Sequence, residues 1–482
     1  MKRTLLIVIL IPVLLLTLCS CSNYTETVYE FAMISEDGDL SALDEYPNLE
    51  YVDLRGSTCY DEILRYAVDH PDVTVRYSVD LGKQRINQDT TEIELLPTEF
   101  DYDTLMHNLK YLPAVKTLTL THTDLSADQL KNLVAAYPSI DIRYDVKCLN
   151  YEWEHTVNEL DLSALTPEEI PEITQAISRL PNLTDVTLSD PFARSNLSPA
   201  DVKNLMDACP DINFHYGFHL FGQTVSTDDQ EMIFDEVMIG NDGVDQIRAA
   251  LSIMDDCTYV KLDTCGIDDE VMAKLRDDYP DKEIVWRIFI DRYNMLTDEI
   301  MVRMAESVND ANVTPLKYCT KVKYLDINFN RLSDFSFVSY MPELECAILR
   351  LTLVSDLTPF ASCPNLTWLE LTDCSQLLDI SPLGQLKNLK YLNIGQTKVS
   401  DITALENVPL ERFVCVKTNV TGDSVEAFTA KHPQCLTVTS GNYRGYGWRY
   451  DDYNQTPFEY YTKIAEIFRY NDYTFTGNRQ GS

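Results

Sequence analysis

Between residues 322 and 420, apolar side chains recur in a frame that fits neither a helix nor a simple alternating strand. Within one such stretch they fall at Leu366, Leu369, Leu371 and Leu377. Successive frames start 22, 22, 23 and 21 residues apart, at Val322, Leu344, Leu366, Leu389 and Leu410. A fixed period of this size is typical of a solenoid, in which each unit buries its apolar side chains against its neighbours.

The recurring residues read L-x-x-L-x-L-x-x-N/C/T-x-L, which resembles the leucine-rich repeat. At the eighth residue after each start, this family prefers a side chain that bonds the turn backbone, and the chain has Asn330, Thr352, Cys374, Thr397 and Thr418. An aspartate follows in four repeats, as in internalin-like proteins, at Asp334, Asp356, Asp379 and Asp401. The resemblance implies an α/β leucine-rich repeat solenoid, with a curved parallel β-sheet on the concave side and helices and turns on the convex side.

A longer version of the frame occurs upstream, with starts 66, 68 and 74 residues apart, at Leu49, Val115, Leu183 and Cys257. Each start leads into a helical stretch that ends near a proline and then into an apolar strand, as in YPSIDIRYDV (137–146). A further short strand and an amphipathic helix follow, for example at 168–180. We therefore expect four double units of the form strand-helix-strand-strand-helix, which resemble divergent repeats of the same superfamily.

The C-terminal segment is expected to protect the end of the solenoid, because an open parallel sheet exposes its edge strand. Thr456-Pro457-Phe458-Glu459 reads as a capping box with proline at the first helical position. We expect one side of the helix that follows to cover the last repeat, with Phe458, Tyr461, Ile464, Ala465 and Phe468. The aromatic segment 442–456 fits either an ordered lid or a mobile tail.

The N-terminus predicts export. Lys2 and Arg3 precede about 15 apolar residues, a pattern typical of a secretory signal and too short for a stable membrane span. Leu18-Cys19-Ser20-Cys21 resembles the bacterial lipobox, in which a small residue precedes the cysteine that receives the diacylglyceryl group. The resemblance implies that Cys21 is the first mature residue and that its acyl chains anchor an exported lipoprotein in the cell membrane, on its extracytoplasmic side.

These patterns divide the chain into a signal peptide (1–20), a lipidated cysteine and tether (21–30), long double units (31–310), regular repeats (311–438) and an aromatic-rich tail with a cap helix (439–482). The tether spans only about 30 Å when extended. In a thick-walled cell the solenoid would therefore stay close to the membrane, which favours an envelope partner over a distant host receptor.

The charge balance narrows the class of partner. Loss of Lys2 and Arg3 with the signal peptide leaves 37 basic and 76 acidic residues, a net charge of −39. Nucleic acid is excluded as a partner, because its phosphates would be repelled. The sequence has no D-x-[DN]-x-[DN]-G loop, so we interpret the acids as a solvated surface rather than as calcium sites.

Chemistry-bearing motifs are few. The eleven cysteines beyond Cys19 and Cys21 show no C-x-x-C pair and several occupy apolar repeat positions, so we expect small buried hydrophobic side chains. His215 and His219 would share one face of a strand, but no third metal ligand accompanies them. No catalytic or cofactor motif is present. We therefore predict a protein that is not an enzyme and needs no metal or cofactor.

The positions that the leucines leave free form the candidate site. Side chains alternate across a strand, so the third, fifth and seventh residues of each repeat point away from the solenoid core. We predict a partner-binding face of aromatic and polar residues, made of Tyr324, Trp368, Tyr391, Arg350, Glu370, Asn393, Arg412 and, upstream, Tyr259. The alternative is that these cross-strand aromatic residues stabilise the sheet and bind nothing.

The sequence thus favours a surface-displayed, membrane-anchored leucine-rich repeat lipoprotein that binds a protein or glycan partner through its concave sheet face. The partner would belong to the cell envelope or to a host surface. The alternative is a structural component of the envelope that assembles through repeat contacts, and an uncharacterised enzyme is a third hypothesis.

Overall fold

The computed structural model describes residues 40–45, 49–472 and 477–478. The chain divides into two compact units at His219/Leu220, here called the N-terminal and C-terminal units. The predicted signal peptide, Cys21 and its tether lie outside the described residues. Of the helices within the described ranges, none is long and apolar enough to cross a membrane.

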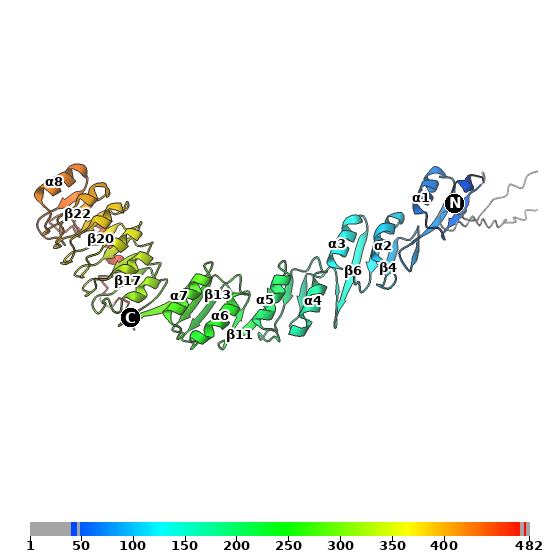
Figure 1. Cartoon of the computed structure of the whole chain (residues 1–482), viewed down its shortest axis with the longest axis horizontal. Coiled ribbons are helices and arrows are strands. Elements are labelled where there is room, and N and C mark those ends of the chain that lie inside the picture. The colour runs from blue at the N-terminus through cyan, green and yellow to red at the C-terminus, as the bar shows by residue number, and fades with distance from the viewer. Residues whose placement is uncertain (1–39, 46–48, 473–476, 479–482) are drawn as a thin grey trace, which may run out of the picture. The chain divides into compact units, whose positions relative to one another are not determined.

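The N-terminal unit alternates strands and helices, which Figure 1 colours from blue to green. Its elements are η1 (Leu40–Glu45), β1 (Tyr51–Leu54), α1 (Tyr60–Asp69), β2 (Thr74–Asp80), β3 (Arg85–Asn87), β4 (Glu92–Leu95), α2 (Tyr102–Asn108), η2 (Leu109–Tyr111), β5 (Thr117–Leu120), α3 (Ala127–Ala136), β6 (Asp141–Cys148), β7 (Tyr151–Glu154), β8 (Glu159–Asp161), η3 (Pro167–Glu169), α4 (Ile170–Ile177), β9 (Asp185–Thr187), α5 (Pro199–Ala208), β10 (Asn213–His215) and β11 (Gly217–Leu220), the last of which ends at the first residue of the next unit.

Three sheets organise this unit, in the strand orders β1-β2-β3, β4-β5-β6-β7 and β8-β9-β10. Neighbouring strands are parallel except β3 and β7, which pair antiparallel with β2 and β6. The sequence analysis did not predict these hairpin strands. Their signal is weak, because the turn after β6 is Leu149-Asn150, with Leu149 at φ 54°, rather than the Asn-Gly pair that marks a tight hairpin.

Burial alternates along the parallel strands of the sheet β4-β7, as the period of 2 requires. In β5, Leu118 and Leu120 are fully buried, whereas Thr117 and Thr119 are half-buried on the other face. Leu130 and Leu133 of α3 are buried as well. One face of the sheet β4-β7 therefore lies in the core that the helix layer closes, and the other face lies open.

The C-terminal unit begins with a similar double unit and continues into short repeats (Figure 1). Its elements are β12 (Gln223–Ser226), β13 (Glu231–Asp235), η4 (Asn241–Gly243), α6 (Val244–Leu251), β14 (Tyr259–Asp263), α7 (Asp269–Asp278), β15 (Glu283–Ile290), β16 (Tyr293–Leu296), β17 (Met301–Arg303), η5 (Thr314–Tyr318), β18 (Tyr324–Asp326), η6 (Ser336–Tyr340), β19 (Cys346–Ile348), η7 (Thr358–Ser362), β20 (Trp368–Glu370), η8 (Ser381–Gln385), β21 (Tyr391–Asn393), η9 (Thr403–Asn407), β22 (Arg412–Val414), α8 (Gly422–Lys431), β23 (Leu436–Val438) and α9 (Glu459–Ile467).

Strands β17 to β23 form one parallel sheet in sequence order, here called the repeat sheet. Its register follows the predicted frame, since the third positions of the repeats pair in one column: Tyr324, Cys346, Trp368, Tyr391 and Arg412. The fourth positions, among them Leu325, Leu369 and Leu392, are fully buried. The predicted leucine contacts between successive repeats are therefore confirmed.

The turn residues act as the repeat frame predicts. Thr352 and Thr397 each donate a hydroxyl hydrogen bond to the carbonyl three residues earlier, at 2.8 Å, and the buried Asn330 donates to Met304 and Ile327. The aspartates cap the convex 3-10 helices: Asp356 and Asp401 each accept the backbone N–H two residues on, at 2.8 Å. Satisfied backbone groups allow these turns to stack closely.

Ten of the eleven described cysteines are buried, and Cys59 is half-buried. Burial raises the pKa of the Cys319 thiol to about 12 and that of Cys374 to about 11. These side chains therefore stay protonated and serve as small apolar core residues, as the sequence analysis predicted.

The predicted capping box of the last helix is wrong. Helix α9 begins at Glu459 with Phe458 as its N-cap, and no side chain caps it. Thr456 instead donates its hydroxyl to Asp452, at 2.7 Å, and ends the preceding loop. The pattern misleads because a Thr-Pro pair closes a loop as readily as it opens a helix.

Two adjacent leucines test the repeat packing. Leu377 is fully buried between repeats, whereas Leu378 is 64% exposed. Leu377→Ala should lower the free energy of unfolding by about 2–5 kcal/mol, because it removes packed methyl groups and leaves a cavity. Leu378→Ala should change it by less than about 0.5 kcal/mol. Urea unfolding followed by circular dichroism measures both, and equal effects would contradict the repeat register.

Candidate binding face

The face of the repeat sheet opposite the leucine core is covered by the segment Tyr443–Tyr470, here called the tail. The centre of the contact is Trp368 on β20, whose ring centroid lies 4.0 Å from that of Trp448 and 5.7 Å from that of Tyr460. Tyr391 on β21 lies 4.7 Å from Tyr460. Trp368 is fully buried and Tyr391 is 7% exposed. The predicted aromatic column is therefore the floor of an aromatic cluster.

Polar residues of the same face also form hydrogen bonds with the tail. Glu370 accepts a hydrogen bond from the indole N–H of Trp448, at 2.9 Å, and is itself 1% exposed. Asn393, fully buried, donates to the backbone carbonyl of Tyr443 at 2.7 Å. Thr372 and the backbone of Gly395 bond the other oxygen of each side chain, so the tail supplies the partners that Glu370 Oε2 and Asn393 Nδ2 would otherwise lack.

A second buried acid, Asp326, lies further along the sheet. The hydroxyl of Tyr470 donates to Asp326 at 2.7 Å, and the guanidinium of Arg303 lies 5.0 Å from the Tyr470 ring. Burial raises the pKa of the Asp326 carboxyl to about 6, although the bond from Tyr470 works in the opposite direction. Sequence reasoning placed Asp326 on this face and did not predict its burial.

The two predicted arginines also contact the tail or its partners. Arg412 lies over the ring of Phe458, with 3.4 Å between the guanidinium carbon and the ring centroid, and pairs with Asp451. Arg350 is 3.3 Å from Asp373, which accepts a hydrogen bond from the Tyr443 hydroxyl at 3.0 Å. Electrostatic contacts therefore hold the tail at both flanks of the aromatic cluster.

The remaining two predicted residues lie apart from this centre. Tyr324 is half-buried, packs edge-on against Phe468 at 6.4 Å, and donates to Glu345 at 3.2 Å. Tyr259 belongs to β14 in another sheet, where its hydroxyl is 3.5 Å from Asp298. The structure therefore gathers seven of the eight predicted residues on one face and leaves Tyr259 out.

The prediction that this aromatic face is open to a partner is contradicted by its burial. Helix α9 was expected to cover the last repeat, but Phe458, Ile464 and Phe468 belong to the cluster that packs on the sheet face. The apolar side chains of the tail bury more surface when they pack across several strands of the sheet than when they pack against its edge strand. A binding role for the eight residues stays a prediction, and it would require the tail to move.

Open faces remain in the double units. On the sheet β4-β7 the side chains opposite the core are polar, and Glu92, Glu94, Asp141, Glu152 and Glu154 are exposed. Lys147 and Arg143 are the basic residues of this face, and Arg143 pairs with Asp141 at 2.6 Å. This face is therefore hydrophilic and carries net negative charge.

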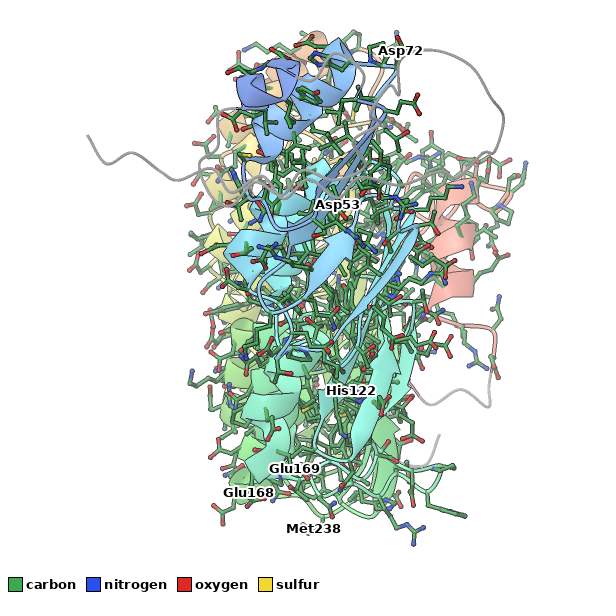
Figure 2. The ribbon with its side chains drawn as sticks, turned by 90° about the vertical axis from the view of Figure 1, so that its right-hand side faces the viewer. Asp53, Asp72, His122, Glu168, Glu169 and Met238 are labelled. Atoms are coloured by element: carbon green, nitrogen blue, oxygen red, sulfur yellow. The ribbon has the colours of Figure 1, made fainter. Side chains whose placement is uncertain are left out.

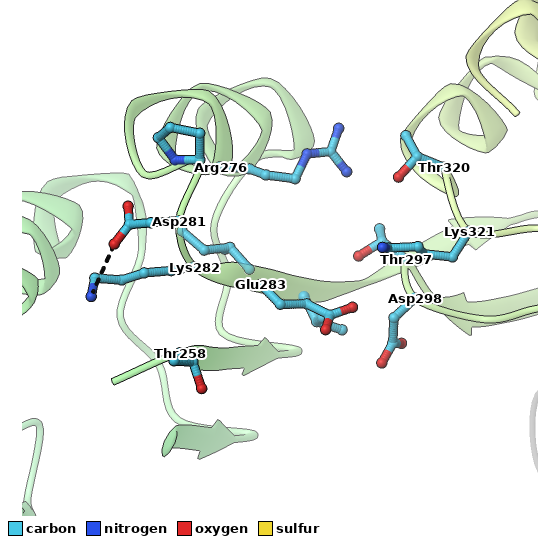
Figure 3. A pocket seen from close by; sticks show the side chains of 12 residues that line it. Thr258, Arg276, Asp281, Lys282, Glu283, Thr297, Asp298, Thr320 and Lys321 are labelled. Carbon is cyan, nitrogen blue, oxygen red and sulfur yellow. Dashed lines mark ion pairs between the residues drawn. The ribbon is translucent and has the colours of Figure 1, made fainter. Parts of the chain in front are cut away.

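A cavity of about 390 Å³ lies in the C-terminal unit, beside the connection from α7 to β15 (Figure 3). Lys282, the ammonium group of which is 3.5 Å from Asp281, donates to the carbonyls of Met254 and Cys257. Arg276 donates to the carbonyl of Tyr318 at 2.9 Å. Because its cations are engaged by the backbone or by a neighbouring acid, this cavity does not favour an anionic ligand.

The predicted histidine strand is interrupted. His215 belongs to β10 and His219 to β11, and Tyr216, between them, is buried with its hydroxyl donating to the Leu197 carbonyl at 2.7 Å. His215 lies 3.1 Å from Asp185. The two imidazoles therefore do not belong to one continuous strand, contrary to the expectation that they would share one face of a strand.

A family profile matches part of the repeat sheet. The family profile described as "Leucine Rich repeats (2 copies)" matches residues 364–407, which run from the turn before β20 to η9. The fold is a leucine-rich repeat solenoid. None of the curated proteins compared with the chain matches it.

Solved structures of low similarity include an internalin (inlF) from Listeria monocytogenes, with 16% identity, a TM-score of 0.26, and coverage of 86% of this chain and 81% of that one. An internalin C2 from the same species has 20% identity and a TM-score of 0.25, over 46% and 80% of the two chains. A leucine-rich repeat protein from Leptospira interrogans has 12% identity and a TM-score of 0.27, over 68% and 90%.

The tail contact can be tested with two aromatic substitutions. Trp448→Ala should destabilise the C-terminal unit by about 3–5 kcal/mol, because it removes a fully buried ring and one of the two side-chain donors to Glu370, the other being Thr372. Tyr453→Ala, at a side chain that is 84% exposed, should cost less than about 0.5 kcal/mol. Urea unfolding and hydrogen exchange across β20 and β21 would show both. Unchanged protection in Trp448→Ala would contradict a closed face.

Asp326 predicts a pH dependence. Its folded pKa of about 6 lies above the unfolded value of about 3.9, so folding favours the protonated acid, and its contribution to stability is lost as pH rises from about 4 to 6. Asp326→Asn keeps an acceptor for Tyr470 and removes this loss, on the order of 3 kcal/mol. The difference in urea midpoint between variant and parent should grow over that window. A constant difference would refute the assignment.

Proposed function

We propose that this chain is an exported, lipid-anchored leucine-rich repeat protein that binds a protein partner on the open sheet face of its N-terminal unit. The anchor rests on the lipobox-like sequence that ends at Cys21. The choice of face rests on a single contrast. The tail buries the face of the repeat sheet, whereas the face of the sheet β4-β7 has exposed side chains on β4, β6 and β7.

The chemistry of this face favours one class of partner. Its carboxylates outnumber Arg143 and Lys147, and the next sheet adds Glu159 and Asp161, which are also exposed. A basic protein surface would be steered toward such a face and would bind with a steep dependence on salt. A glycan is less favoured, because sugar rings stack on aromatic side chains and β4, β5 and β6 present none here. We therefore expect a cationic protein of the cell envelope.

A charge-removal variant tests the proposal. The chain from Ser22 onward would be used to capture cell-envelope proteins, beside Glu92→Gln/Glu154→Gln/Glu159→Gln. The matched control, Asp103→Asn/Asp128→Asn/Glu168→Gln, removes the same charge from exposed residues of α2, α3 and η3 in the helix layer. The face variant should bind a captured partner at least about tenfold more weakly, and the control should bind as the parent does.

Salt and fold provide the remaining controls. Affinity of the parent should fall as ionic strength rises, because exposed charges are screened beyond about 8 Å at physiological salt. Circular dichroism would establish that both variants are folded. Equal weakening in the two variants would mean that total charge, not this face, controls binding. A partner lost only on Trp368→Ala would instead place binding at the repeat sheet.

A further inference from the structure

His122, Asp145 and Glu152 form a group of possible metal ligands in the N-terminal unit. The ligand atoms of the three residues lie within 4.8 Å of one another. The imidazole Nδ1 of His122 is 2.5 Å from Asp145 and 3.9 Å from Glu152. Figure 2 shows His122 beside the cyan strands. Three elements, the turn after β5, then β6 and β7, therefore bring one nitrogen and two carboxylates together.

The positions follow from the strand geometry. His122 has φ 53°, in the left-handed region, and its backbone N–H donates to Asp145 at 2.9 Å. Glu152 pairs with Lys147 in the antiparallel register of β6 and β7, two residues along β6 from Asp145. Side chains two residues apart on a strand share a face, so Asp145 and Lys147 both lie on the open face of the sheet. Glu152, opposite Lys147, lies on the same face, and His122 reaches it from the turn after β5.

Two of the other double units place a cation here, whereas the unit of β9 to β12 has Gly217 at the position of Asp145. In the unit of β14 to β16, Arg287 stands where Asp145 does, since the two occupy the same register position before the hairpin turn. Its guanidinium binds both carboxylate oxygens of Asp263, at 2.8 and 2.7 Å, and donates to Asn294 at 2.7 Å. That unit therefore supplies its own cation to the acceptors around the turn.

The first double unit does so as well. Arg85 of β3 stands at the register position of Glu152, opposite Asp80, and donates to the carbonyl of Arg55 at 2.9 Å. The unit of β5 to β7 thus differs in kind from these two units. Where they place a guanidinium, it places two carboxylates around an imidazole. The comparison is independent of the closeness of the three ligands, and it shows that acceptors around this turn can hold a cation.

The ligand set selects the class of cation. An imidazole nitrogen with two carboxylate oxygens suits zinc and other first-row divalent metals, whereas calcium and magnesium prefer oxygen alone. Donors on one zinc ion at about 2.1 Å are roughly 3–3.5 Å apart, and the present separations bracket that range. Asp145 and Glu152 also line an open cavity of about 800 Å³ beside His155, so water or a partner side chain has access to a fourth position.

We propose that His122, Asp145 and Glu152 bind one divalent transition metal ion of the zinc class. The metal replaces the proton that His122 shares with Asp145 and draws Glu152 in. It also ties the turn after β5 to the β6-β7 hairpin. The site leaves at least one coordination position for solvent or for a partner.

Zinc itself is the probe. Full-length chain in detergent would be titrated with Zn²⁺ by calorimetry, with millimolar Mg²⁺ present to occupy weak carboxylate sites. His122→Ala and Asp145→Asn should each weaken the tightest binding event at least about tenfold. His107→Ala, at an exposed histidine of α2, should leave it unchanged. Circular dichroism would verify that all three variants fold.

A spectroscopic readout separates coordination from a general structural effect. Co²⁺ bound in place of Zn²⁺ should give visible absorption bands that disappear in His122→Ala and persist in His107→Ala. Zinc binding that survives both site substitutions would overturn the proposal. So would the absence of any binding event in the parent, and His122 would then serve only as a hydrogen-bond partner of Asp145.

Discussion

The structure depends on one constraint: no repeat buries its own apolar face. A unit of about 22 residues has a single strand and a single turn of convex helix, so its leucines gain a partner only when the next repeat stacks on it. Leu325, Leu369 and Leu392, fully buried and in register across β18, β20 and β21, are the result. The hydrogen bonds of Asn330 and Thr397 follow from the same constraint, because stacking removes the turn carbonyls from water.

Stacking leaves two surfaces of the repeat sheet exposed unless another segment covers them: its edge and its face. Strand β23 and helix α8 continue the solenoid at the edge, while the tail covers the face. The cover is polar as well as apolar, since Glu370, Asn393 and Asp326 all bond to tail groups. Its fit is incomplete, because the indole nitrogen of Trp368 has no hydrogen-bond partner among the described residues. Burying acids and an unpaired hydrogen-bond donor on this face lowers the stability of the fold, whereas an ordinary apolar core has no such groups.

The two parts of the chain therefore present different chemistry to a partner. The repeat sheet uses its aromatic residues internally, so it offers little apolar area. The sheet β4-β7 keeps one face open and acidic, and the hairpin strand β7 widens that face. A wide acidic face suits recognition of a basic protein surface, in which charge steers the encounter and neighbouring polar groups set the register. The metal ligands of the second double unit lie on this same face.

By itself the sequence determined the repeat frame, its register, its turn residues and the alternation of strand and helix upstream, because these depend on residues within one or two repeats. Local patterns likewise placed Trp368, Tyr391 and Glu370 on one face and made the cysteines core residues. Tertiary structure decided what covers that face. The contact between Trp448 and Glu370 joins residues 78 apart in sequence, and no periodic pattern encodes it. The same holds for His122, Asp145 and Glu152, since only strand pairing and a turn at φ 53° bring them together. Alternation over a few residues determines which side chains share a sheet face. Which segment covers that face depends on contacts between residues far apart in sequence, and these form only when the whole chain packs.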